Sequence, residues 1–212
     1  QDSSSAASDV YKRQLYIRPF MFATDEYVGI KPADNFKFII FTSPVGPYYP
    51  EPVKVLVADK YVRAFPGGVG AAKAAGNYGA TLLPVIEAKK QGYDQILWMD
   101  GREFKYVQEI GTMNVFFVIN GVTITAPLDG GTILEGVTRD SVIQLLRSRG
   151  VSVEERPLSI DEIIQAHEAG QLTEVFGAGT AASIADISDS GYKGKNYALP
   201  ASDGREYSLW LK

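Results

Sequence analysis

The sequence predicts a mixed α/β, or α+β, fold, and three observations favour it. Short runs rich in β-branched and aromatic residues recur along the chain, as is typical of strands. Asn120-Gly121 lies between two such runs and indicates a tight antiparallel hairpin, because both turn positions require a positive φ. The helical patterns are scattered among the strands and do not alternate with them, which argues against a doubly wound parallel sheet.

The individual elements follow from the same patterns. The expected strands are 36–42, 54–58, 95–99, 114–119 and 122–126. A first helix is expected over about 77–91, with lysines near its end, where the helix dipole favours them. A second helix starts at Thr138 and continues with apolar residues on one side. A third opens at Ser159-Ile160-Asp161-Glu162, which is a capping-box pattern.

Both ends of the chain carry unusual patterns. Residues 1–14 are rich in Ser and Ala and end in Asp9-Val10-Tyr11-Lys12-Arg13-Gln14, which resembles a translated sequencing-library adaptor. We interpret 1–14 as a disordered scar that is unrelated to the fold. The stretch 205–212 begins a helix-like pattern without the residues that usually end a helix, which indicates truncation. This interpretation places one domain over 15–212.

Composition excludes several classes of function. The chain has 45% hydrophobic and 22% charged residues, which is ordinary for a globular protein. A net charge of -4 argues against a nucleic-acid partner, and the apolar runs are too short to span a membrane. Cysteine is absent and His167 is the single histidine, so the sequence predicts no disulfide, no thiolate catalysis and no metal site. We expect His167 to be solvated.

The segment richest in chemistry is 66–79. It does not fit a P-loop, because Lys73 lies between two alanines. A dinucleotide fingerprint starting at Gly68 requires a glycine where Lys73 stands, so a nucleotide-binding protein is supported only by the glycines of 67–70. Two interpretations stay open. One is a close-packed turn with its lysine in solvent. The other is a lysine that small neighbours leave without water or a local counter-ion, which favours a nucleophilic amine.

The stretch Gly70-Ala71-Ala72-Lys73-Ala74-Ala75-Gly76-Asn77-Tyr78 resembles the pyridoxal-phosphate lysine segment of branched-chain amino acid aminotransferases, which belong to the fold-type-IV, class-IV group. Other stretches resemble further motifs in that family's order: Leu15 to Pro19 for the substrate carboxylate, Glu109 to Asn114 for the cofactor nitrogen, and Leu128 to Gly130, Gly136 to Arg139 and Phe176 to Ala182 for the phosphate. The resemblance implies the family's large cofactor-binding domain, a strand-rich pseudo-barrel surrounded by helices.

The resemblance implies that several residues bind pyridoxal phosphate. Lys73 would form a Schiff base with the cofactor aldehyde and, once freed, move a proton. Tyr78 would hydrogen-bond the phenolic oxygen, and Glu109 would keep the pyridine nitrogen protonated. The phosphate would be bound by Val137 and Thr138, at the start of a helix, and by Thr180.

The resemblance also implies how substrate is bound. The substrate carboxylate would be bound by Tyr16, Arg18 and the amides of Ala181 and Ala182, and an arginine fork suits a carboxylate. Thr112 and Met113 would line the substrate pocket. Arg63, which precedes the glycines, is expected near the site but receives no firm role.

The activity that the resemblance implies is transfer of the amino group of Leu, Ile or Val to 2-oxoglutarate, by a ping-pong mechanism in a cytoplasmic homodimer. Two departures stand out. The redox cysteine pair of the mammalian members is absent, and nothing replaces the family's N-terminal domain. Two alternatives stay open: a non-catalytic fragment that at most binds pyridoxal phosphate, and a sibling D-amino-acid aminotransferase or aminodeoxychorismate lyase. Thr112-Met113-Asn114 favours the branched-chain group.

Overall fold

The computed structural model describes residues 14–46, 48–201 and 204–212. It divides the chain into two compact units, Gln1–Tyr48 and Tyr49–Lys212. The division lies inside the stretch 15–212, which the sequence interpretation treats as one domain. Most of the expected scar, 1–13, lies outside the described residues, so that interpretation stays a prediction. Within the described part of the chain, no helix is long and apolar enough to cross a membrane.

The first unit contains one antiparallel hairpin of β1 (Gln14–Ala23) and β2 (Phe36–Val45). Its connecting loop is closed by the Asp25 carboxylate. That group accepts hydrogen bonds from the backbone N–H groups of Asp34 and Asn35, both at 3.1 Å, and from Asn35 Nδ2 at 3.0 Å. The two ends of the connecting loop are therefore joined by side-chain contacts, in addition to the backbone hydrogen bonds between the two strands.

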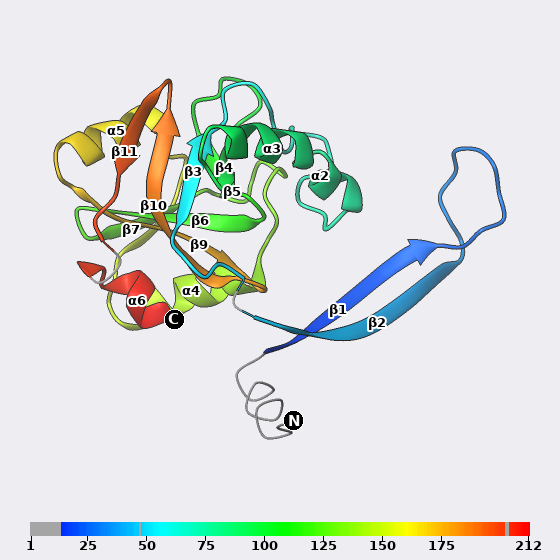
Figure 1. Ribbon diagram of the computed structural model, residues 1–212. Coiled ribbons are helices and arrows are strands. Elements are labelled where there is room, and N and C mark those ends of the chain that lie inside the picture. The colour runs from blue at the N-terminus through cyan, green and yellow to red at the C-terminus, as the bar shows by residue number, and fades with distance from the viewer. Residues whose placement is uncertain (1–13, 47, 202–203) are drawn as a thin grey trace, which may run out of the picture. The chain divides into compact units, whose positions relative to one another are not determined.

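The second unit is built around a nine-stranded mixed sheet (Figure 1). Its strands are β3 (Val53–Val57), β4 (Gln95–Met99), β5 (Val107–Ile110), β6 (Met113–Ile119), β7 (Val122–Thr125), β8 (Val153–Glu155), β9 (Leu172–Gly179), β10 (Ser183–Tyr192) and β11 (Lys195–Ala198). The sheet runs β11-β10-β3-β4-β5-β6-β7-β8, and β9 pairs with both β10 and β6. Strands β3, β4, β5, β6, β9 and β10 thus close into a ring, which confirms the strand-rich pseudo-barrel and the mixed fold class.

Helices cover the outside of this ring (Figure 1). They are α2 (Ala75–Gly79), α3 (Leu82–Lys90), α4 (Val137–Ser148), α5 (Ile160–Glu168) and α6 (Tyr207–Leu211). The single helix expected over 77–91 is wrong, because it is divided into α2 and α3. Pro84 explains the break, since it has no N–H to donate to the carbonyl of Ala80. The cap of α5 is confirmed: Ser159 accepts a hydrogen bond from Glu162 N at 3.1 Å.

Strand β6 separates the two hydrophobic clusters of the unit. Its side chains alternate, as strand geometry requires. Val115 and Phe117 join the larger cluster, to which α3 and α5 also contribute, while Phe116 and Val118 join the smaller one beneath α4. Phe116 stacks on Phe176 of β9, with ring centroids 5.1 Å apart. Because both faces of β6 are covered, the strand holds a fixed register at the centre of the unit.

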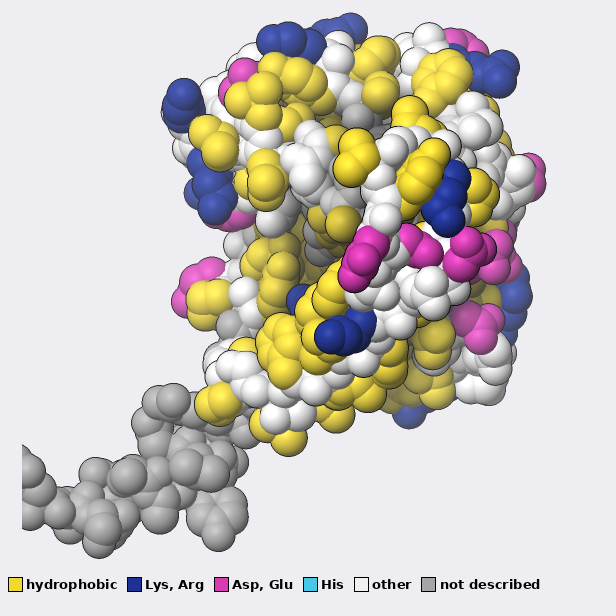
Figure 2. Space-filling model, turned by 90° about the vertical axis from the view of Figure 1, so that its right-hand side faces the viewer, with side chains coloured by type: hydrophobic (Ala, Val, Ile, Leu, Met, Phe, Trp, Pro, Cys, Tyr) yellow, Lys and Arg dark blue, Asp and Glu magenta, His cyan; other side chains and the backbone are white. Residues whose placement is uncertain are grey.

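Hydrophobic side chains also reach the surface, as the space-filling view shows (Figure 2). In the hairpin the exposed large apolar residues include Ile17, Met21, Phe36, Phe38 and Ile40. In the second unit they include Val62, Phe65, Leu82, Leu83, Ile86 and Val137.

Candidate active site

The candidate site lies where three segments of the second unit meet: the β5–β6 hairpin, the loop before α4 and the β9–β10 turn. Strand register places Glu109 opposite Asn114, and Asn114 opposite Ala178. Gly136, at the start of α4, packs so closely on Asn114 that a Cβ at Gly136 would collide with Asn114 Oδ1. The phosphate motifs and the cofactor-nitrogen motif, which are distant in sequence, therefore come together.

The glycine-rich segment packs against the loop before α4. Ala71 N donates to Gly131 O at 3.1 Å. At Gly70 an added Cβ would lie 2.6 Å from Thr132 O and 2.5 Å from Ala64 Cβ, so this position has no room for a side chain. Glycine is thus required here because two loops cross closely.

Asn77 holds the lysine loop in shape. Its buried side chain donates from Nδ2 to Val69 O at 2.7 Å and to Ala72 O at 2.9 Å. Both acceptors lie in the stretch just before Lys73, and such side-chain bonds satisfy carbonyls that no regular ladder reaches. The loop that carries Lys73 is therefore braced from within.

Lys73 is exposed, and its Nζ donates to Tyr78 Oη at 2.9 Å. The expectation that its small neighbours shield this lysine from water is wrong, because glycine and alanine have too few atoms to cover a long side chain. The alternative of a lysine in solvent is the one that the structure shows. The charge of Lys73 also acts on Glu109, where it lowers the pKa of that carboxyl group.

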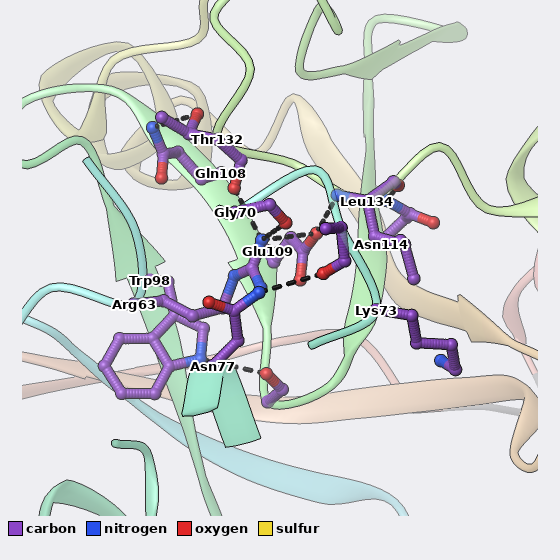
Figure 3. Close-up of polar contacts among 12 residues, drawn as sticks. Arg63, Gly70, Lys73, Asn77, Trp98, Gln108, Glu109, Asn114, Thr132 and Leu134 are labelled. Atoms are coloured by element: carbon purple, nitrogen blue, oxygen red, sulfur yellow. Dashed lines mark hydrogen bonds and ion pairs between the residues drawn. The ribbon is translucent and has the colours of Figure 1, made fainter. Parts of the chain in front are cut away.

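Glu109 is the most perturbed carboxyl group at the site. Its side chain is 4% exposed, and burial raises its pKa from 4.5 to about 7. The positive charge of Arg63, a hydrogen bond from Leu134 N and the charge of Lys73 act in the opposite direction. Oε1 accepts from an Arg63 terminal nitrogen at 3.1 Å and from Leu134 N at 2.8 Å (Figure 3). Burial outweighs these partners, so Glu109 titrates near neutral pH.

One cavity joins several of the predicted site residues. It is lined by Arg63, Ala72, Asn77, Tyr78, Thr81, Glu109, Gly111, Thr112, Asn114 and Leu134. Tyr78 brings Lys73 to the edge of this cavity through their hydrogen bond. Met113 lies elsewhere: it is buried in the core, where a Cβ on Gly177 would lie 2.7 Å from its Cε.

The residues expected to bind phosphate lie at two chain turns. Val137 is the exposed first residue of α4 and Thr138 is the half-buried second one. The N-cap is Gly136, and none of the described side chains caps this 12-residue helix, so its first N–H groups are open to an anion. Thr180, Ala181 and Ala182 form the turn between β9 and β10, and Thr180 and Ala181 are exposed.

Tyr16 and Arg18 lie on β1 of the first unit. The Arg18 guanidinium carbon is 4.8 Å from the centroid of the Tyr16 ring, so the two side chains form a cation–π pair. A role for this pair in substrate binding stays a prediction.

His167 is half-buried, and the expectation of a solvated side chain is wrong. Its Nε2 lies 2.7 Å from Ala198 O, and its ring packs edge-on against Tyr197, with centroids 5.4 Å apart. The contact with β11 arises from tertiary packing, which the helical pattern around His167 does not reveal.

Sequence reasoning placed Arg63 near the site without a role, and it gave no role to four further residues that build the site: Asn77, Gln108, Thr132 and Leu134. Gln108 had a usable signal, because it is a polar residue in a fully buried strand and donates to Thr132 Oγ1 at 2.9 Å. The pairing of Arg63 with Glu109 had no sequence signal, since the two residues lie 46 positions apart in the chain.

Comparisons with known proteins agree with this arrangement. A family model described as amino-transferase class IV matches residues 3–188. Branched-chain-amino-acid transaminase 1 of Bacillus subtilis (strain 168) is 51% identical over 185 residues, which cover 85% of this chain and 52% of the relative.

Two solved structures share the fold. A branched-chain aminotransferase from Thermoproteus uzoniensis with norvaline has a TM-score of 0.79 and 28% identity; the match covers 93% of this chain and 62% of that chain. An aminotransferase from Brucella abortus bound to the co-factor PLP has a TM-score of 0.74 and 25% identity; the match covers 98% of this chain and 71% of that chain.

The chain spans about half the length of the curated relatives it matches. The match of the family model nevertheless covers most of this chain and includes the lysine loop, Glu109 and the start of α4. The ring of strands, the converging motifs and these matches show that the chain belongs to the class IV aminotransferase family.

Proposed function

We propose that the enzyme to which this chain belongs is a pyridoxal-phosphate-dependent branched-chain amino acid aminotransferase. It transfers the amino group of Leu, Ile or Val to 2-oxoglutarate by a ping-pong mechanism, and it acts as a cytoplasmic homodimer. The observation that carries the proposal is the cavity where buried Glu109 meets Tyr78, the hydrogen-bond partner of Lys73. The names of the relatives and the order of the motifs support the choice of substrate.

The side chains and backbone groups at the site suit pyridoxal phosphate. An amine at Lys73 suits the aldehyde, a buried carboxylate at Glu109 suits a protonated ring nitrogen, and the uncapped start of α4 suits the phosphate. Within the described part of the chain, the hydrogen bonds of Glu109 all go to Oε1. Oε2 is therefore left for a donor in the cavity.

When bound, pyridoxal phosphate supplies an aldehyde that combines with amines and a ring that accepts electrons. The protein supplies proton control and orientation. Lys73 Nζ is the base that moves a proton at the substrate Cα, and Tyr78 Oη holds that nitrogen in place. The Glu109 carboxylate keeps a proton on the ring nitrogen that faces it.

Phosphate binding is assigned to Val137 and Thr138 at the start of α4 and to Thr180 in the β9–β10 turn. We assign the substrate carboxylate to Tyr16, Arg18 and the amides of Ala181 and Ala182. We assign the pocket for the substrate side chain to Thr112, which lines the cavity. Met113, which the motif also suggested, is buried in the core and does not line this cavity. The exposed guanidinium of Arg18 supports its part, because it can donate two parallel hydrogen bonds to a carboxylate.

Borohydride reduction in the presence of pyridoxal phosphate tests the cofactor assignment. Peptide mass spectrometry should find the phosphopyridoxyl group on Lys73, and Lys73→Ala should remove it. Lys90→Ala is the matched control, because Lys90 is equally exposed on α3 and does not line the cavity. A label spread evenly over the lysines, or one unchanged in Lys73→Ala, would contradict the proposal.

A second candidate function is pyridoxal-phosphate binding without turnover by the 212-residue chain. The observation that favours it is exposure: Lys73, Thr112 and Val137 are all open to water in the second unit. Exclusion of water and exact positioning supply much of an enzyme's rate. Transamination of leucine that Lys73→Ala abolishes would exclude this candidate, whereas a Lys73 label without turnover would support it. D-alanine as the preferred donor would indicate the sibling D-amino-acid enzymes.

A further inference from the structure

Arg63 joins three parts of the candidate site through one terminal nitrogen. This nitrogen donates to Gly70 O at 3.2 Å, to Glu109 Oε1 at 3.1 Å and to Thr132 O at 2.5 Å. The side chain is 7% exposed, so the charge is nearly dry. Arg63 therefore contacts the lysine loop, the carboxylate and the loop before α4 at the same time (Figure 3).

The contact with Glu109 determines which carboxylate oxygen is available. Oε1 already accepts from Arg63 and from Leu134 N, which come from two directions. A carboxylate held by one oxygen in this way presents its second oxygen to the open side of the site, and Glu109 lines the cavity there. Orientation is thus imposed by side-chain contacts and does not depend on a bound ligand.

The same contact favours the charged form of Glu109. Burial alone favours the neutral acid, and the charge of Arg63 is the largest influence against it. Among the residues that the structure describes, two further titratable side chains lie at this site: Lys73, whose charge acts on Glu109 in the same direction, and Tyr78, which lines the same cavity. Only an ionised Glu109 carboxylate can stabilise the positive charge of a protonated ring nitrogen, whereas the neutral acid cannot. The charge state of Glu109 therefore decides whether it can keep that nitrogen protonated.

We propose that Arg63 is a positioning residue, which holds the ionised Glu109 carboxylate by Oε1 so that Oε2 meets the cofactor ring nitrogen. This inference rests on the proposed function. Arg63 acts through Glu109. Its bonds to Gly70 and Thr132 hold the glycine-rich segment and the loop before α4 next to that carboxylate.

A titration of Glu109 in the chain without pyridoxal phosphate tests the inference. Glutamate is labelled with ¹³C at its side-chain carboxyl, and Glu109→Gln assigns the signal of interest. In Arg63→Gln we expect the pKa of Glu109 to rise by about 1 to 3 units, because an opposite charge at this distance shifts a carboxyl by that amount. In Arg63→Lys, which keeps a positive charge, we expect a rise of less than about 1 unit.

Arg205→Gln is the matched control. Arg205 is also buried and donates to backbone carbonyls of Val175, Ile187 and Pro200, so its loss should lower stability without moving the Glu109 titration. An unchanged Glu109 titration in folded Arg63→Gln would overturn the inference, and so would an equal shift in Arg205→Gln. Where Arg63→Gln does not fold, Arg63→Lys decides: a Glu109 titration identical to that of the unaltered chain overturns the inference, and a measurable rise in the pKa of Glu109 supports it.

The titration also separates this inference from the proposed function. No cofactor is present, so a failed titration leaves the labelling of Lys73 by pyridoxal phosphate unaffected. An absent Lys73 label with a shifted Glu109 titration would instead refute the proposed function and leave the Arg63–Glu109 pair established.

Discussion

Strands β6 and β2 carry similar apolar sequences in opposite environments. Every residue of β6 (Met113–Ile119) is buried, whereas in β2 only Ile39 and Val45 are half-buried and the others are exposed. β6 pairs with β5, β7 and β9, while β2 pairs with β1 alone. The difference shows that an apolar sequence favours strand formation but does not by itself lead to burial. Burial also requires neighbouring strands and a second layer, which a two-stranded ribbon does not supply.

The largest expected effect tests this comparison directly. Phe116→Ala should lower the free energy of unfolding by about 3 to 5 kcal/mol, because it removes a fully buried ring stacked on Phe176. Phe38→Ala, at an exposed aromatic position of β2, should change it by less than about 0.5 kcal/mol. Urea unfolding followed by fluorescence measures both. Equal losses in the two variants would show that the hairpin is as well packed as the ring of strands.

A second effect concerns pH. The pKa of Glu109 is raised in the folded chain, so its contribution to stability is complete below pH 4.5 and is lost as pH rises through about 7. The difference corresponds to about 3 kcal/mol at most. Unfolding measured from pH 4 to 8 should show this decline, and Glu109→Gln should flatten it. A profile that Glu109→Gln leaves unchanged would assign the decline to other groups.

A smaller effect is expected at the lysine loop. Asn77→Ala removes the two bonds from Nδ2 to loop carbonyls and should cost about 1 to 2 kcal/mol, since those acceptors lose a buried partner. Asn196→Ala is the control, because exposed Asn196 on β11 donates to Asp189 on the neighbouring strand β10 and should matter little. Urea unfolding compares the two, and a loss at Asn196 as large as that at Asn77 would argue against the bracing role.

The smallest effect belongs to the hairpin loop. Hydrogen bonds from the backbone and side chain of Asn35 lower the pKa of exposed Asp25. Its contribution is therefore present above pH 3.8 and is lost as pH falls through the lower folded pKa, which is opposite in sign to Glu109. Amide chemical shifts of Asp34 and Asn35 should move in acid, and Asp25→Asn should abolish that movement without changing global unfolding. A changed urea midpoint in Asp25→Asn would show that the loop is coupled to the main fold.

Local signals predicted much of the central fold. The strand expected at 95–99 is β4, and the Asn120-Gly121 hairpin is confirmed, with φ values of 52° and 77° at its two turn positions. The strands β9 and β10 were not expected. Glycines in β9 weaken any local strand pattern, and the pairing of β9 with β6 and β10 depends on chain segments far away.

The candidate site divides in the same way. Lys73, Tyr78 and Glu109 were predicted because short motifs carry them, and the structure brings all three to one cavity and its edge. The exposure of Lys73 and the burial of Met113 could not be predicted from those motifs. Both depend on which side of a loop or strand faces the core, and that follows from packing.

The sequence by itself determined the family and the mixed fold class, and it predicted Lys73 as the reactive lysine, because these depend on contiguous residues. Only the tertiary structure decided that Arg63 meets Glu109, that Gly70 must lack a side chain where it crosses Thr132, and that Glu109 is dry enough to titrate near 7. These properties arise from contacts between residues up to 69 positions apart, whose energies exist only after the ring of strands has closed.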